Sequence, residues 1–247
     1  MLRITDATIG YPRHEVASGI DLEIEHGDVI TLVAPNGSGK TTLLKALSGK
    51  GRTLKAGEVD VDGIAPSRSR DYSRKVFFAS PDDTPLVPEM TLREHLATIA
   101  ELWGHECDAA AIAKRAGVED LLNIKVKRMS QGMQQLSLIA CTLAADADYL
   151  LFDEPLNGLD PLKARTATHL FAELAREGKG LVVSSHIFAG LEDIATELAF
   201  LTPTGFQIHP TTADWQRLFV RTYGKEETSS GAADICPTTP KHWRHHD

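Results

Sequence analysis

Residues 33–42 read VAPNGSGKTT, in which two glycines precede a lysine and a threonine at the start of a helical pattern. Gly37 and Gly39 allow backbone N–H groups to approach an anion closely, and a helix N-terminus adds positive potential. Lys40 can then reach the outer phosphates of a nucleotide, and Thr41 can offer a hydroxyl ligand to Mg²⁺. The stretch therefore predicts a phosphate-binding loop.

One residue departs from the spacing GxxxxGK[ST], because Ala34 stands where the first glycine is expected. A methyl group is the smallest change from glycine, so we expect the loop to form if the backbone angles of Ala34 are ordinary. The alternative is a glycine-rich turn that binds no ligand. The residues of this loop expected to contact ATP or Mg²⁺ are Asn36, Gly37, Ser38, Gly39, Lys40, Thr41 and Thr42.

A second group of residues that could do chemistry lies in YLLFDEP, residues 149–155. Asp153 ends an apolar run typical of a buried strand, where a carboxylate can hold a magnesium-bound water. Glu154 follows and can orient and deprotonate an attacking water. The alternative is an acidic strand end without a chemical role. Together with the lysine of the first motif, the pair predicts nucleotide hydrolysis.

Strands and helices alternate in the sequence around these motifs, which indicates an α/β fold with a parallel sheet. An antiparallel β region is predicted first, and a helical insertion is predicted near residues 88–140. Strands are predicted over residues 2–9, 21–25, 28–34, 57–63, 75–80, 149–153 and 181–185, and helical segments over residues 39–50, 91–122, 161–179 and 212–223. Residues 224–247 are rich in Thr, Ser, Pro and charges and predict a flexible tail.

Composition limits the classes of partner and compartment. The 247 residues include 26 Lys and Arg against 34 Asp and Glu, a net charge of −8, so no general basic field favours nucleic acid. No apolar run reaches the roughly 18 to 20 residues that span a bilayer, and the N-terminus lacks a signal-peptide pattern. We therefore expect a protein on the cytoplasmic side. The three cysteines and the histidines of KHWRHHD are interpreted as bystanders and not as a disulfide or metal site.

Five motifs in a fixed order make the chain resemble the nucleotide-binding subunit of an ABC (ATP-binding cassette) transporter. They are APNGSGKTT, MSQGMQQ, LLFDEP, NGLDP and SSHIF, and the resemblance covers residues 1–223. It implies a P-loop NTPase (RecA-like) core with a small antiparallel β subdomain, over about residues 1–87 and 141–223. It also implies an inserted helical subdomain over about residues 88–140.

The resemblance further implies roles for residues outside the two chemical motifs. MSQGMQQ resembles the family signature LSGGQ at Ser130 and Gly132, and Gln135 is expected to replace its glutamine, so that the segment grips a phosphate held by the opposite subunit. Asp160 is expected beside that opposite site. His186 is expected to contact the γ phosphate and steady the hydrolytic water, and Tyr11 to stack on adenine.

The main departure from the family pattern is Asp82, which stands where the family has a glutamine before the segment that meets the membrane partner. An aspartate can still ligate Mg²⁺, together with Thr41 and Asp153, but it is shorter and negatively charged. We expect hydrolysis to persist with altered coupling geometry.

We therefore expect an ATPase that dimerises around two ATP molecules, with itself or a related subunit, using Mg²⁺. It would power a separate membrane permease docked near residues 82–105. The signature variant resembles the exporter branch, so export is expected. Two alternatives stay open: a soluble ABC-type ATPase serving translation, repair or iron–sulfur assembly, and a nucleotide sensor with slow hydrolysis, for which Asp82 is the support.

Overall fold

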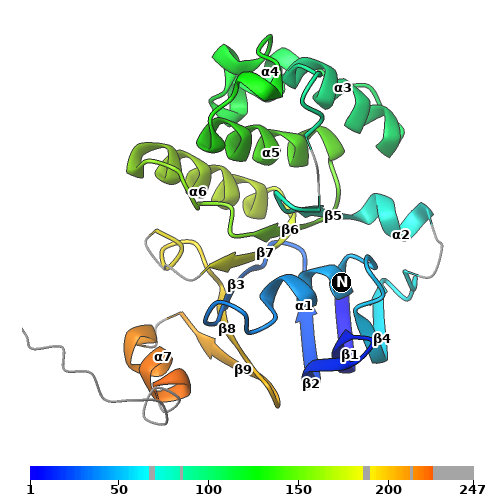
Figure 1. The fold of residues 1–247 in the computed structure, drawn as a ribbon, viewed down its shortest axis with the longest axis vertical. Coiled ribbons are helices and arrows are strands. Elements are labelled where there is room, and N and C mark those ends of the chain that lie inside the picture. Colours follow the sequence, from blue (N-terminus) through cyan, green and yellow to red (C-terminus); the bar gives the residue numbers. More distant parts are fainter. Residues whose placement is uncertain (67–69, 84–85, 186–189, 212–213, 225–247) are drawn as a thin grey trace, which may run out of the picture.

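The computed structural model describes residues 1–66, 70–83, 86–185, 190–211 and 214–224, and contains two sheets flanked by helices (Figure 1). The smaller sheet is antiparallel with the order β2-β1-β4, formed by β1 (Leu2–Tyr11), β2 (His14–Ile24) and β4 (Leu54–Val61). Alternate residues of β1 and β2 are buried, as expected for strands with one face on a core. The predicted antiparallel β region is thus confirmed.

The larger sheet has the order β5-β6-β7-β3-β8-β9. Five strands run parallel, and the edge strand β9 pairs antiparallel with β8. Their sequences are almost continuously apolar because parallel sheets are covered on both faces. The strands are β3 (Val29–Val33), β5 (Val76–Ala79), β6 (Tyr149–Asp153), β7 (Gly180–Ser185), β8 (Glu197–Thr202) and β9 (Gly205–Pro210). The last two were not predicted from the sequence.

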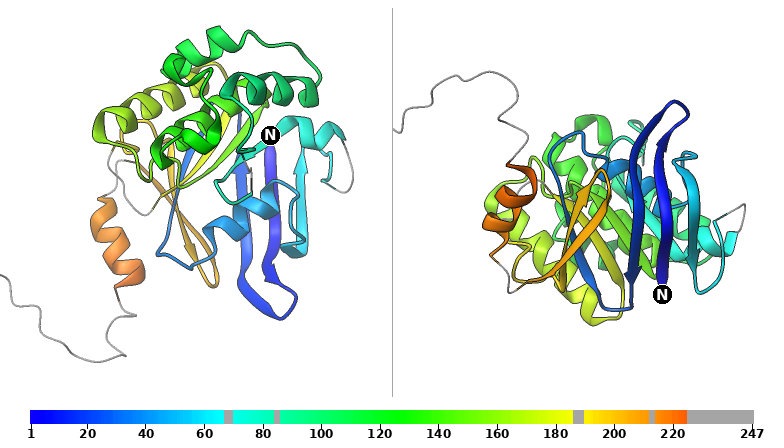
Figure 2. Two further views of the ribbon diagram at one scale, coloured as in Figure 1. Left: turned by 45° about the horizontal axis from the view of Figure 1, so that its top comes forward. Right: turned by 90° about the horizontal axis from the view of Figure 1, so that it is seen from below.

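Helices cover the sheets and divide the apolar residues into two large cores. Figures 1 and 2 show α3, α4 and α5 gathered at the end of the molecule away from the antiparallel sheet. The helix α5 continues to residue 145, past the predicted limit of the insertion at 140, so the domain division stays a prediction. The helices are α1 (Lys40–Leu47), α2 (Arg70–Lys75), α3 (Leu92–Trp103), α4 (Ala109–Ala116), α5 (Gln131–Ala145), α6 (Pro161–Arg176) and α7 (Trp215–Tyr223), with short 3₁₀ turns at Glu119–Leu121 and Val126–Arg128.

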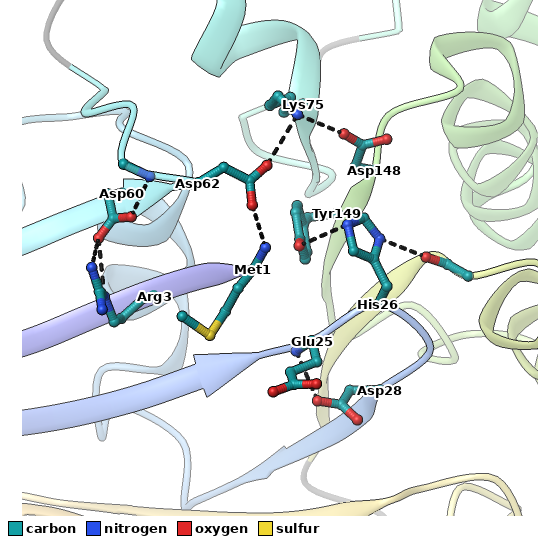
Figure 3. A network of polar contacts seen from close by, with 12 residues as sticks. Met1, Arg3, Glu25, His26, Asp28, Asp60, Asp62, Lys75, Asp148 and Tyr149 are labelled. Carbon is teal, nitrogen blue, oxygen red and sulfur yellow. Dashed lines mark hydrogen bonds and ion pairs between the residues drawn. The ribbon is translucent and has the colours of Figure 1, made fainter.

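A polar network joins the two sheets at the amino ends of β5 and β6 (Figure 3). Lys75 makes ion pairs of 3.2 Å with both Asp62, which follows β4, and Asp148, which precedes β6. The hydroxyl of the buried Tyr149 lies 3.3 Å from the ring of His26, which precedes β3. These contacts fix the antiparallel sheet against the parallel one and leave the carboxyl edge of the parallel strands for the chemical motifs.

Candidate nucleotide-binding site

The predicted phosphate-binding loop connects β3 to α1, as its sequence required. Gly37 and Gly39 have φ angles of 81° and 102°, a region that L-residues rarely adopt. A Cβ at Gly39 would lie 2.2 Å from Cγ1 of Val16, so a side chain there would clash with β2. Ala34 is fully buried and is not among the residues with positive φ. The condition for tolerating alanine at that position is therefore met.

Lys40 is the first residue of α1 and is buried at the centre of the loop. Its ammonium group donates hydrogen bonds to the carbonyl oxygens of Ala34 at 2.8 Å and Pro35 at 3.3 Å. It also lies 3.3 Å from the carboxylate of Glu154. The lysine of one motif and the carboxylate of the other therefore meet, although they are far apart in the sequence.

Asp153 ends β6 and has both carboxylate oxygens held by hydroxyl groups. The Thr41 hydroxyl donates to one oxygen at 2.7 Å, and the Ser184 hydroxyl donates to the other at 2.8 Å. Ser184 also accepts the backbone N–H of Glu154 at 2.9 Å. Ser184 was not predicted as a site residue. Its only sequence signal is its place in an apolar strand, whereas the register that pairs it with Asp153 across β6 and β7 is tertiary information.

Thr41 and Asp153 together fit a small hard cation, because a hydroxyl and a carboxylate oxygen meet at the phosphate-loop helix. The described residues contain no cluster of three or more His, Cys, Asp or Glu side chains that could hold a metal alone. Mg²⁺ commonly binds through one or two protein ligands and the phosphates of a nucleotide. The donor set at Asp153 thus suits an ion that arrives with a nucleotide.

Glu154 has a φ of 50°, a left-handed backbone conformation that is uncommon outside glycine. The hydrogen bond from its N–H to Ser184 supports this turn at the end of the strand. Non-glycine residues in such conformations cluster at functional sites. Here the turn brings the Glu154 side chain to Lys40, at the rim of the same pocket.

These residues line one pocket of about 490 Å³ at the carboxyl ends of β3 and β6. Tyr11, which is 43% exposed, lies at its rim, and the Thr42 hydroxyl is 3.5 Å from the phenol oxygen of Tyr11. His14, a second ring on the same hairpin, lines the pocket too and was not predicted. The lining residues are Tyr11, His14, Val16, Asn36, Gly37, Gly39, Lys40, Thr41, Thr42, Ser80, Pro81, Asp82, Gln131, Gln135, Asp153, Glu154 and Asn157. Ser38, expected to bind, is not among them.

Asp82 reaches the pocket from a tight turn in which the N–H of Asp83 donates to the carbonyl of Ser80 at 3.2 Å. The neighbouring Asp83 forms a 2.8 Å ion pair with Lys45 of α1. The hydrogen bond to Asp83 raises the pKa of Lys45 and outweighs the opposing effect of burial. The segment that carries Asp82 is therefore tied to the helix that follows the phosphate loop.

The signature residues occupy the start of α5, which Ser130 caps by accepting the N–H of Met133 at 3.3 Å. Ser130 is exposed and does not line the pocket that holds Lys40. A Cβ at Gly132 would lie 2.9 Å from the carbonyl oxygen of Gly158, so glycine permits the close approach of the next loop. Gln135 is 6% exposed and lines its own chain's pocket, and its expected contact with an opposite subunit stays a prediction.

Asp160 is exposed at the beginning of α6, where it accepts the N–H groups of Leu162 at 3.1 Å and Lys163 at 3.0 Å. The backbone hydrogen bond from Lys163 holds the pKa of Asp160 below its usual range. Leu162, next to it, is 67% exposed although apolar. Asp160 thus lies outside the Lys40 pocket, on a surface with an uncovered apolar side chain.

Some predicted residues cannot be placed. His186, the tail from residue 225 and its three histidines lie outside the described residues, as does Cys236. Cys107 and Cys141 are free thiols, and burial raises the pKa of Cys141 to about 12. Within the described ranges, no helix has the length and apolar character needed to cross a membrane.

A second groove of about 350 Å³ lies between the end of α1, strand β5 and helix α3. Val87 and Leu102 line it and are 45% and 67% exposed. Lys50 is placed over the Phe78 ring, 5.7 Å from its centroid, and burial lowers the pKa of Lys50. One wall of the groove, between Leu86 and Trp103, comes from the region of residues 82–105 expected to meet a partner.

Comparison with known proteins gives a consistent assignment. A family profile described as ABC transporter matches residues 17–157. The ABC transporter ATP-binding protein NatA of Bacillus subtilis (strain 168) is 31% identical over 188 residues, which cover 74% of this chain and 76% of that protein. The Nod factor export ATP-binding protein I of Burkholderia orbicola (strain AU 1054) is 30% identical over 192 residues, covering 75% of this chain and 62% of that protein.

A solved structure described as the ATP binding subunit of an ABC transporter superposes with a TM-score of 0.77. It is 25% identical, and the match covers 90% of this chain and 95% of that chain. The α/β fold with a nucleotide-binding core expected from the sequence is thereby confirmed.

Proposed function

The chain belongs to the ABC transporter family as one of its ATP-binding ATPase subunits, and from this premise we propose that it powers export through a separate membrane permease. The observation that carries the proposal is the convergence of Lys40, Thr41, Asp153 and Glu154 in one pocket. A phosphate cradle, a cation site and a general base are together the parts that ATP hydrolysis requires.

Each residue has a separate task in the proposed reaction. Lys40 and the N–H groups near Gly37 and Gly39 bind the phosphates of ATP, and Tyr11 stacks on the adenine ring. Thr41 and Asp153 hold Mg²⁺, which when bound offsets negative charge on the phosphate oxygens.

Glu154 accepts a proton from the attacking water as the water oxygen bonds to the terminal phosphorus, and the bond from that phosphorus to the bridging oxygen breaks with ADP as the leaving group. His186 is proposed to steady that water. Asp82 is proposed as a further oxygen ligand at the pocket wall.

We place the complete site between two subunits, with Lys40 from one chain and Ser130 from the other. Ser130 and Asp160 are exposed and stand outside their own chain's pocket, and Leu162 beside Asp160 is uncovered. A surface that binds a second cassette explains all three features. Closure of the pair around two ATP molecules is then a rigid-body switch, because hydrolysis removes the phosphate that both chains bind.

The permease is proposed to dock in the groove that Val87 and Leu102 line, at the cytoplasmic face of the membrane. Exposed apolar side chains rimmed by polar residues are typical of protein contacts. Export is supported by the signature variant and by the relative whose name includes Nod factor export.

Affinity purification from detergent-solubilised host membranes tests the proposal. We expect mass spectrometry to identify a polytopic membrane protein in stoichiometric amount with the chain, and the purified complex to hydrolyse Mg·ATP. Recovery of only soluble proteins or ribosomes, with membranes free of the chain, would contradict the transport role and favour a soluble ABC-type ATPase.

A further inference from the structure

Helix α7 packs beside β8 and β9, as the views in Figures 1 and 2 agree. Its apolar face covers a small core made of Val33, Leu198 and Phe200, against which Leu218, Phe219 and Tyr223 pack. The rings of Phe219 and Tyr223 lie 4.9 Å apart. The last described helix of the chain is therefore docked over the end of β3, the strand that leads into the phosphate loop.

The hydroxyl of Tyr223 is directed at two backbone carbonyl groups. It lies 3.0 Å from the oxygen of Val33 and 2.8 Å from the oxygen of Leu201. Burial raises the pKa of Tyr223, so the phenol keeps its proton and serves as a donor. The helix thus bridges the carboxyl ends of β3 and β8.

Val33 is the last residue of β3, and the next carbonyl, that of Ala34, accepts a hydrogen bond from Lys40 at 2.8 Å. Two consecutive carbonyl groups at the loop entry are therefore fixed from two sides, one by Tyr223 and the other by Lys40. Ala34 lies between these two carbonyl groups, so a change in its backbone angles would turn one carbonyl relative to the other and disturb at least one of the two contacts. The orientation of the Lys40 side chain is consequently linked to the docking of α7.

We propose that Tyr223 is a positioning residue for the phosphate loop, through which α7 sets the affinity of the chain for nucleotide. The inference rests on the proposed function in one respect, namely that the Lys40 loop binds nucleotide. Tyr223 itself does not line the nucleotide pocket, so it acts through the backbone of Val33. Asp153 ends β6 and Glu154 follows it, and β7 lies between β6 and β3 in the sheet. We therefore expect Tyr223 to affect nucleotide affinity more than the proton-transfer step, to which it is linked through the 3.3 Å contact of Lys40 with Glu154.

The test compares two variants of the full chain that each lose one hydroxyl from adjacent residues of α7. Tyr223→Phe keeps the ring packing and removes the bonds to Val33 and Leu201. Thr222→Val is the matched control, because its hydroxyl donates to Gln207 at 3.3 Å, on β9 and outside the nucleotide pocket. Isothermal titration with Mg·ADP gives the affinity, thermal unfolding gives the stability, and steady-state hydrolysis gives kcat and KM.

Tyr223→Phe should weaken Mg·ADP binding roughly 3- to 10-fold, the loss of about one neutral hydrogen bond, and raise KM with kcat within about twofold. Thr222→Val should leave the affinity for Mg·ADP within about twofold of that of the unsubstituted chain. We expect this difference between the two variants even if they unfold at similar temperatures. Equal affinities of Tyr223→Phe and the unsubstituted chain would overturn the inference and leave Tyr223 a packing residue. If the unsubstituted chain binds no Mg·ADP, the proposed function fails first, and the inference fails with it.

Discussion

The ammonium group of Lys40 lies 3.3 Å from the carboxylate of Glu154, joining the phosphate loop to the end of β6. We therefore expect a nucleotide phosphate to compete with Glu154 for the ammonium group of Lys40. In the proposed reaction the phosphate takes over Lys40, and Glu154 becomes available to the attacking water.

Replacement of the Glu154 carboxylate should separate the binding of ATP from its hydrolysis. Glu154→Gln should lower kcat about 10²- to 10⁴-fold, since an amide cannot accept the proton of the attacking water. Mg·ATP affinity should be retained or increased, because the neutral amide competes less for Lys40, and a stable dimer should elute in size-exclusion chromatography with ATP. Glu173→Gln, an exposed carboxylate of α6, is the control. Undiminished turnover by Glu154→Gln would exclude the general-base assignment.

The Ser184 hydroxyl donates to Asp153 and accepts the N–H of Glu154, so it should matter for stability and for turnover. Ser184→Ala leaves a buried oxygen of Asp153 and the N–H of Glu154 without their partner. We expect a loss of about 1–3 kcal/mol in the free energy of unfolding and about tenfold in kcat.

The matched control for that serine is Thr31→Val in the neighbouring strand β3. The buried Thr31 hydroxyl has no hydrogen-bond partner among the described residues, so its removal should leave stability unchanged or raise it. Denaturant unfolding measures both variants. Equal changes in the free energy of unfolding for Ser184→Ala and Thr31→Val would show that the Ser184 contacts do not orient Asp153 and Glu154.

Asp82 adds a third carboxylate to a pocket that also contains Asp153 and Glu154 and is lined by one lysine. Asp82→Gln should therefore increase the affinity for ADP in EDTA on the order of fivefold, because one negative charge near the phosphates is removed. With Mg²⁺ the gain should be smaller, since the ion offsets that charge. Asp71→Asn, on α2, is the control. Unchanged affinity in EDTA would show that the Asp82 charge does not act on the nucleotide.

The groove at Leu102 gives a prediction about the partner. Leu102→Asp should abolish co-purification of a permease and permease-dependent stimulation of hydrolysis, while the chain's own hydrolysis stays within about twofold, because an exposed side chain contributes little to folding. Val220→Asp on α7 is a control of equal chemistry, since Val220 is 66% and Leu102 67% exposed. If co-purification of the permease is lost with both variants, or with neither, the groove is excluded as the docking site.

The local parts of this site follow from the sequence because they depend on neighbours along the chain. Glycines at 37 and 39, a preceding apolar run and a following helical pattern are sufficient to predict the loop between β3 and α1. The apolar run before Asp153 likewise predicts β6. The strands β8 and β9 and the short helix α2 were missed, since each is short and their pairing partners are distant in the chain.

The sequence by itself determined the chemical groups and the order in which they occur. Only the tertiary structure decided which of them meet: Lys40 with Glu154, Ser184 with Asp153, and Tyr223 with Val33. Each of these pairs is separated by many residues, and its contact depends on strand register and helix docking, which periodicity does not encode. The same physical reason applies to Gln135, which the tertiary structure places in the lining of its own chain's pocket, while its role toward an opposite subunit stays a prediction.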